Sequence, residues 1–116
     1  MSDIKNPIGA ITLLWSENFC QKDLWIFEKI REFGFTAVDI AVGDPEQFPT
    51  GETAAELKKT GLIPVITKAL PPECNPVSPD PRCRRAAVEY LKKLVDIAAE
   101  IHSTLVAGVI YAGWGY

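Results

Sequence analysis

The side chains with the strongest intrinsic chemistry are few in this sequence and lie far apart. The chain has one histidine, His102, and three cysteines, at Cys20, Cys74 and Cys83. A metal centre or a nucleophile activated by a base needs such residues at close spacing, and the sequence has no CxxC pair and no histidine near Cys20. Widely separated cysteines in odd number are typical of free thiols in a reducing compartment rather than of a disulfide framework.

Carboxylates and one lysine at the ends of apolar runs are the next candidates. Asp39 interrupts a buried run, so it must find a hydrogen-bonding partner or have a raised pKa, and we expect a scaffold role. Lys68 and Glu73 follow another apolar run and lie either at a pocket or in a solvated loop. Asp44, Glu46 and Glu73 would hold a metal only weakly, because they lie in loops without a histidine. These residues indicate no catalytic set and no metal site.

Four apolar runs position these side chains. The runs cover residues 8–16, 36–43, 62–70 and 103–111. Each is short, rich in β-branched residues and almost without charge, which is typical of strands covered on both faces. We therefore predict four buried strands.

Helical patterns separate the four runs. KDLWIFEKIREF ends at Gly34 and AAELKKT ends at Gly61, and glycine at these positions is typical of a helix end. A longer helix is predicted to begin at Pro81, with Asp80 as its N-cap. Strands that alternate with helices in this way indicate an α/β fold with a parallel sheet and right-handed crossovers.

Two architectures fit this order of elements. One is half of a TIM barrel, with the pattern (βα)3β, and the other is a small open sheet of the flavodoxin-like type. Both place a site at the carboxyl ends of the strands. The segment LLWSENF after the first strand has no glycine, so the phosphate loops of Rossmann and P-loop proteins are absent. A closed barrel needs about eight strands, more than these runs provide.

Length and composition limit the functional classes. A chain of 116 residues with 47% hydrophobic content suits one domain, here a single half-barrel domain over residues 1–116. The formal net charge of −3 is spread along the chain, which argues against nucleic acid and against anionic lipid as partners. The polar start MSDIKNPIG is unlike a signal peptide, and no apolar run is long enough to span a membrane. We expect a cytoplasmic protein.

Five segments resemble a known family: IGAITLLW, GFTAVDIAVGDPEQF, GLIPVITKALPP, RRAAVEYLKKLVDIAAEI and STLVAGVIYAGW. Together they are similar to the N-terminal half of sugar epimerases of the D-tagatose/D-psicose 3-epimerase group, within the xylose isomerase-like TIM-barrel superfamily. The resemblance covers nearly the whole chain and lies in the succession of strand ends rather than in one short motif. It favours the half barrel.

The resemblance also implies a chemistry that this chain does not complete. Enzymes of this group use a divalent metal (Mn, Co or Mg) and two glutamates that move a proton at the carbon beside the ketone, and these groups lie on later strands. The resemblance implies no catalytic residue and no metal ligand here, and His102 should lie away from the pocket. It does imply aromatic residues beside a sugar ligand, at Trp15, Phe19 and Trp114, although buried or interface aromatics are the commoner case.

A half barrel has two unpaired strand edges, here the first and fourth strands, and open edges invite pairing. Two copies related by a twofold axis would form a closed sheet, so we expect a homo-oligomer, with a dimer favoured. In the first helix, Trp25, Ile26 and Phe33 lie off the expected core stripe of Leu24, Phe27 and Ile30, which makes them interface candidates.

Two hypotheses from different classes follow. The first is an engineered or excised half-barrel scaffold that folds and self-associates without a complete active site. Its helix surfaces RCRR and IHST match the family pattern poorly. The alternative is a metal-dependent ketose 3-epimerase or sugar isomerase, active only when a partner chain supplies the second half. An open flavodoxin-like monomer is the remaining possibility.

Overall fold

The sheet of this protein is parallel and has its strands in sequence order. The structure is a computed structural model that describes residues 5–115, so Met1–Ile4 of the polar N-terminal segment and Tyr116 of the YAGWGY loop lie outside the described residues. The strands are β1 (Gly9–Ile11), β2 (Ala37–Ala41), β3 (Ile63–Thr67) and β4 (Val106–Ala107), in the order β1-β2-β3-β4. The predicted parallel α/β fold is confirmed, with β1 and β4 at the two edges.

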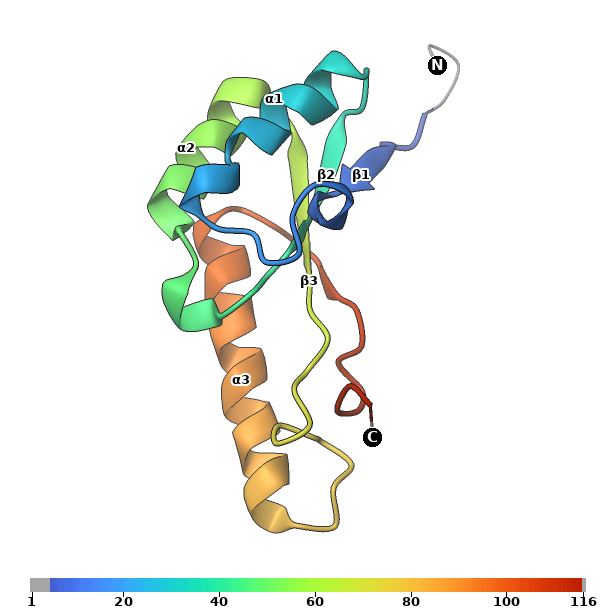
Figure 1. The fold of residues 1–116 in the computed structure, drawn as a ribbon, viewed down its shortest axis with the longest axis vertical. Helices are drawn as coiled ribbons and strands as arrows, with labels where there is room; N and C mark the ends of the chain where they lie inside the picture. The colour runs from blue at the N-terminus through green and yellow to red at the C-terminus, as the bar shows by residue number, and fades with distance from the viewer. Residues whose placement is uncertain (1–4, 116) are drawn as a thin grey trace.

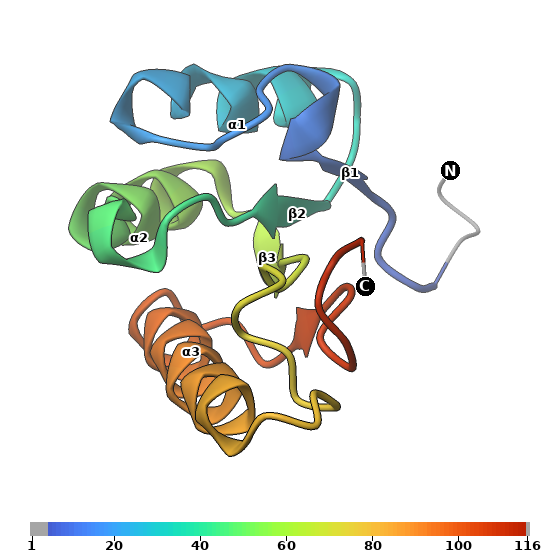
Figure 2. The same ribbon diagram turned by 60° about the horizontal axis from the view of Figure 1, so that its bottom comes forward.

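Three helices lie on one face of this sheet, as Figures 1 and 2 show. They are α1 (Trp25–Glu32), α2 (Thr50–Thr60) and α3 (Pro81–Glu100). The predicted helix signals are confirmed, because Gly61 ends α2 in the left-handed region at φ 72° and the Asp80 carboxylate accepts from the Arg82 amide at 2.9 Å. No helix of residues 5–115 crosses the opposite face, and none of them is long and apolar enough to span a membrane.

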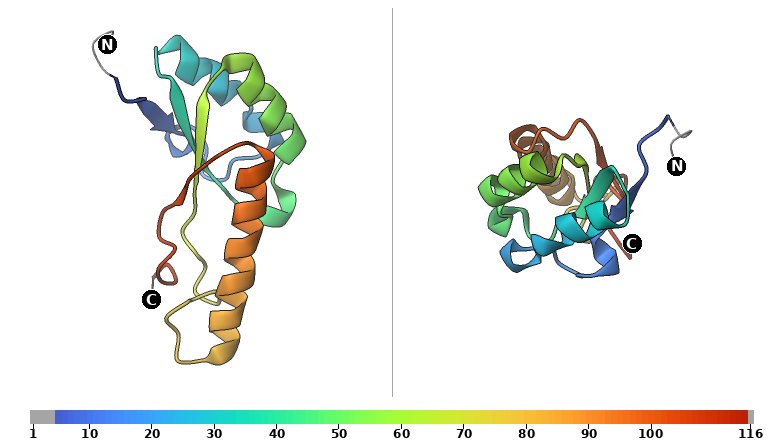
Figure 3. Two further views of the ribbon diagram at one scale, coloured as in Figure 1. Left: turned by 180° about the vertical axis from the view of Figure 1, so that it is seen from behind. Right: turned by 90° about the horizontal axis from the view of Figure 1, so that it is seen from above.

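The two faces of the sheet differ in what covers them. Val38, Ile40 and Ile66 alternate toward the helices and are 0% exposed. The intervening register positions, which align Ile11 with Asp39 and Asp39 with Val65, belong to the other face and are only partly buried. Figure 3 shows the result from behind and from above, with helices along one side and strands open on the other. This is the arrangement of half a barrel.

All four strands are shorter than the sequence predicts, and β1 and β4 are shortened the most. The run 8–16 was predicted as one strand, but β1 stops at Ile11 and Thr12–Leu14 form a 3-10 turn. The run 103–111 contains a strand of two residues, because Gly108 follows it with φ 106° and turns the chain. An apolar run therefore shows that a segment is buried, but not where its extended backbone ends.

The first helix buries a wider stripe than predicted. Ile26 was expected to lie off the core stripe, yet Ile26, Phe27 and Ile30 are all 0% exposed. Helix positions are about 100° apart, so Ile26 lies beside Phe27 and one turn below Ile30, within reach of the same core. Trp25 at 50% and Phe33 at 61% are exposed, as expected of a surface patch.

Candidate functional site

The carboxyl ends of all four strands surround one hollow of about 260 Å³. Its polar lining comes from Glu17 and Asn18 after β1 and from Thr67 and Lys68 at the end of β3. Gly108 and Val109 close it on the β4 side. Because parallel strands bring their carboxyl ends to one edge, residues far apart in sequence meet here, as both candidate folds predicted.

The wall of the hollow between β1 and β2 is fixed by a buried hydroxyl. Thr12 is 0% exposed, and its Oγ1 accepts a hydrogen bond from the Ala41 amide at 2.9 Å. This bond replaces a ladder bond at the point where the backbone leaves β1 for the 3-10 turn. The turn directs Leu13, which lines the hollow, toward the rim.

The wall between β3 and β4 depends on the absence of a side chain. A Cβ at Gly108 would lie 2.4 Å from the Lys68 carbonyl oxygen and 2.6 Å from Thr67 Oγ1. The φ of 106° at Gly108 is also one that other residues rarely adopt. Glycine therefore lets the segment after β4 pass close against the end of β3.

Lys68 is tied to the rim by its ammonium group. Its Nζ donates to the Gly43 carbonyl at 2.7 Å and lies 6.0 Å from the centre of the Tyr90 ring. Burial lowers the pKa of Lys68, and the nearby Asp44 carboxylate only partly opposes this. Burial also raises the pKa of Tyr90 to about 12. Through these contacts Lys68 links the end of β3 to the loop at Gly43 and to α3 at Tyr90.

Asp39 carries an unpartnered carboxylate on the open face of the sheet. Its Oδ1 is buried and has no hydrogen-bond partner among residues 5–115. Desolvation by burial raises the pKa of Asp39. The sequence predicted that Asp39 would find a partner or have a raised pKa, and the unpartnered Oδ1 agrees with the second alternative.

The loop after β1 is organised around a second aspartate. Asp23 is 6% exposed and accepts from Ser16 Oγ at 2.9 Å and from the Cys20 amide at 3.0 Å. Burial raises the pKa of Asp23, but these hydrogen bonds together outweigh it, so that the pKa lies below its ordinary value. Asp23 therefore acts as an ionised clamp that holds residues 16–23 in place.

The three aromatic candidates do not meet in the hollow. Phe19 is 3% exposed and stacks on Phe27 with ring centres 5.4 Å apart, so its ring belongs to the core. Trp15 is partly buried against that core. Trp114 is 63% exposed, beyond the end of β4. Among the described residues that line the hollow, none is one of these three.

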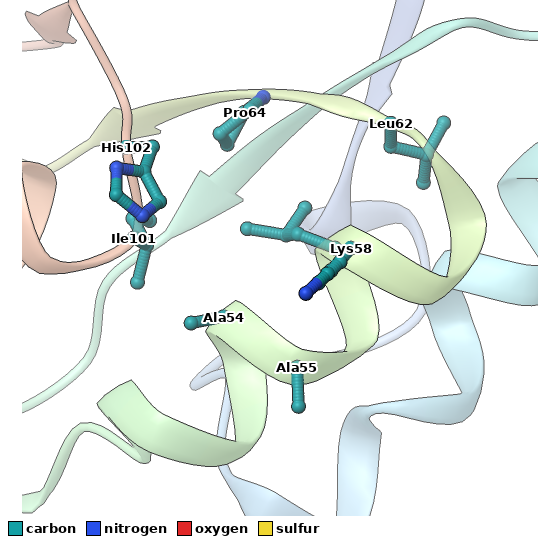
Figure 4. A pocket seen from close by; sticks show the side chains of 8 residues that line it. Ala54, Ala55, Lys58, Leu62, Pro64, Ile101 and His102 are labelled. Atoms are coloured by element: carbon teal, nitrogen blue, oxygen red, sulfur yellow. The ribbon is translucent and has the colours of Figure 1, made fainter.

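The described residues do not form a ligand set for the divalent metal that the resemblance implies. Residues 5–115 contain no group of three histidine, cysteine, aspartate or glutamate side chains able to hold an ion. All three cysteines are free and partly buried. His102 is exposed beside Pro64 at the amino end of β3, in a separate groove with Lys58 on its other wall (Figure 4). It lies away from the hollow, as expected.

Sequence reasoning missed the residues that shape this site through hydrogen bonds. Thr12 and Asn75 are buried polar side chains with bonds to distant amides, of Ala41 and Gly113 respectively. Their sequence neighbourhoods, an apolar run and a proline-rich loop, gave no such signal. Asn18 could have been found from its position just after a predicted strand end, whereas Thr67 lies inside the predicted run 62–70.

Comparison with known proteins agrees with this geometry. Residues 27–115 match the family described as xylose isomerase-like TIM barrel. The chain is 31% identical to the ketose 3-epimerase of Arthrobacter globiformis over 106 residues, which is 90% of this chain and 37% of that protein. It is 28% identical to the L-ribulose 3-epimerase of Mesorhizobium japonicum, over 93% of this chain and again 37% of the relative. The chain therefore spans about 37% of the length of these curated relatives.

Solved structures show the same fold. The D-allulose 3-epimerase of Methylomonas sp. superposes with a TM-score of 0.85 at 23% identity, covering 92% of this chain and 38% of that chain. A structure of L-ribulose 3-epimerase gives a TM-score of 0.84 at 26% identity, covering 92% of this chain and 36% of that one. The predicted half-barrel fold and the predicted resemblance to 3-epimerases are both confirmed.

Proposed function

Because the chain belongs to the xylose isomerase-like TIM-barrel family, we propose that it serves as one half of a ketose 3-epimerase barrel and acts on a sugar only when the other half is supplied. The observation that carries this proposal is the hollow at the carboxyl ends of β1 to β4, in a sheet that has its helices on one face only (Figure 2). The remaining strands of a barrel would close that face. Residues 1–116 form one half-barrel domain in this proposal.

The polar rim suits a sugar. Glu17, Asn18, Thr67 and Lys68 offer hydrogen-bond donors and acceptors above an apolar floor, which is the combination that small polar ligands need. A structure of the Methylomonas relative is a complex with D-allulose. Trp15 and Trp114 do not line the hollow in this half, and we assign them to an aromatic wall beyond its rim, with Phe19 supporting it from the core.

The catalytic groups of the reaction lie outside this chain in our proposal. The divalent metal and the two proton-moving glutamates implied by the resemblance would come from the later strands. This half contributes the position of the sugar and the exclusion of water around it. Three free cysteines also support a reducing, cytoplasmic setting.

Complementation tests this function directly. The purified chain is mixed with a chain that carries the later strands of the Arthrobacter globiformis ketose 3-epimerase, and conversion of D-fructose to its 3-epimer is followed with manganese present. We expect turnover in the mixture and none from either chain alone. A matched variant, Thr67→Leu, should lower turnover by filling the hollow, whereas Thr104→Leu on the exposed surface should not. A mixture that associates without turnover would contradict the proposal.

A second candidate is a half-barrel scaffold, engineered or excised from such an enzyme, that self-associates without a complete site. The observations that favour it are the unpaired edges of β1 and β4 and the exposure of Trp25 and Phe33 on α1. In a homodimer, β1 of one copy would lie beside β4 of the other.

Solution mass tests self-association. Light scattering across a dilution series should show a dimer that dissociates on dilution, and Trp25→Glu should give a monomer at every concentration. Gln21→Glu adds the same charge at a neighbouring exposed position and should leave the dimer intact. A folded monomer at all concentrations would exclude the homodimer and favour an open flavodoxin-like sheet.

A further inference from the structure

The segment after β4 is hydrogen-bonded at two points to Leu70, which lies in the loop that follows β3. The Leu70 amide donates to the Val109 carbonyl at 3.0 Å, and the Leu70 carbonyl accepts from the Trp114 amide at 2.7 Å. Leu70 is 0% exposed. Residues 109–114 therefore form a loop whose two ends meet at the buried backbone of Leu70, and Trp114 is the second of these ends.

Asn75 gives this loop a third attachment. Its side chain is 1% exposed, and its Oδ1 accepts from the Gly113 amide and from the Val77 amide, each at 3.1 Å. Both partners are N–H donors, which fixes the orientation of the Asn75 amide. One oxygen atom thus shapes the connection between β3 and α3 and also holds Gly113 against it.

The two loops pack tightly at Gly113. A Cβ at that position would lie 3.0 Å from Pro72 Cα and 3.3 Å from Asn75 Cβ. Gly113 is buried although Trp114, the next residue, is mostly exposed. The loop is therefore held by a hydrogen bond and by close packing at Gly113, immediately before Trp114.

We propose that Asn75 is a positioning residue, which sets the place and direction of the Trp114 indole by holding the Gly113 amide. This inference deepens the proposed function, in which Trp114 faces the sugar, and rests on it for its biological meaning. Without the Asn75 oxygen, the Gly113 amide loses its partner and the loop keeps only its bonds to Leu70. The indole then samples many directions, and a ring that has to stack on a sugar loses its fixed orientation.

Fluorine NMR of the full chain labelled with 5-fluorotryptophan tests this inference. The three tryptophans, Trp15, Trp25 and Trp114, are assigned with single Trp→Phe variants. In Asn75→Ala, the Trp114 resonance should move at least halfway toward its position in the denatured chain, while the Trp25 resonance stays in place. Asn75→Asp keeps the accepting oxygen and should restore the native Trp114 resonance. Val77→Ala, an exposed neighbour in the same loop, is the matched control and should change nothing.

A Trp114 resonance that stays within a tenth of its native position in Asn75→Ala would overturn the proposal. If all three resonances collapse, Gly113→Ala replaces that variant, and it must shift Trp114 alone for the proposal to stand. Titration of the wild-type chain with D-fructose separates the proposed function from the positioning role of Asn75. A Trp114 resonance that does not shift with added sugar argues against the proposed function but not against the role of Asn75.

Discussion

The Thr12 hydroxyl accepts a hydrogen bond from the Ala41 amide at 2.9 Å and so joins the turn after β1 to β2 behind one wall of the hollow. Thr12→Val keeps the shape of the side chain but leaves a buried amide without a partner. We expect a loss of about 1–3 kcal/mol in the free energy of unfolding, measured by urea denaturation. Thr104→Val, at an exposed position, should cost almost nothing. Equal stability of the two variants would contradict the role given to this bond.

The raised pKa of Asp39 predicts a pH dependence. Below its ordinary pKa of 3.8, Asp39 is protonated in the folded and the unfolded chain and has no cost. As pH rises through its folded pKa, the folded state must ionise a desolvated carboxyl, and the stability that protonated Asp39 contributes is lost. The stability of Asp39→Asn relative to wild type should therefore increase as pH rises above 3.8, and should stop increasing once the folded carboxyl is ionised. Parallel stability curves for the two proteins would refute this.

The lowered pKa of Asp23 predicts the opposite pH dependence. Its ionised form is held by Ser16 and Cys20, so its contribution is present above its ordinary pKa of 3.8 and is lost as pH falls through its folded pKa. Asp23→Asn should be less stable than wild type near neutral pH, and the difference should shrink in acid. A constant difference across the titration would mean that the charge of Asp23 is not what holds the loop.

The burial of Phe19 and the exposure of Trp114 predict different costs for their removal. Phe19→Ala removes a core ring that stacks on Phe27, so we expect a loss of about 3–5 kcal/mol. Trp114→Ala keeps the backbone bond to Leu70 and should change stability by less than about 0.5 kcal/mol. Thermal and urea unfolding of both variants checks this. A large loss in Trp114→Ala would place the indole in the fold rather than at a binding surface.

The end of α3 predicts a stabilising substitution. His102 has φ 63°, and the Ser103 amide donates to the Ala98 carbonyl at 2.8 Å, which closes the helix at a position that favours glycine. His102→Gly should stabilise the protein by about 0.5–1 kcal/mol, whereas His102→Ala should not. If both variants lose stability equally, the imidazole itself contributes to the fold.

Much of the fold could be predicted from the sequence because one-sided burial leaves a clear pattern. The four apolar runs and the glycines at helix ends gave the order of elements and both sheet edges. Strand limits could not be predicted, because β1 ends where the Thr12 hydroxyl, not a change in hydropathy, takes over a backbone amide. The burial of Ile26 was missed because the width of the core stripe of α1 depends on what packs against it.

The candidate site was less predictable than the fold. Its position at the strand ends follows from topology, but its lining does not. In the sequence, Phe19 lies in a predicted loop, and only its stacking on Phe27 in the structure shows that its ring is part of the core. Asn75 lies in a proline-rich loop, and its importance depends on Gly113, 38 positions away. Contacts of that range cannot be read from local spacing.

The one-sided cover of the sheet has a consequence for how a barrel of this kind comes into being. Val38, Ile40 and Ile66 are already fully enclosed by α1, α2 and α3, with no strand from the other half. In an enzyme of the relatives' length, such a unit has its own core before the later strands leave the ribosome. During synthesis from the N-terminus, this half would then fold first, and the next strand could pair with the unpaired edge of β4.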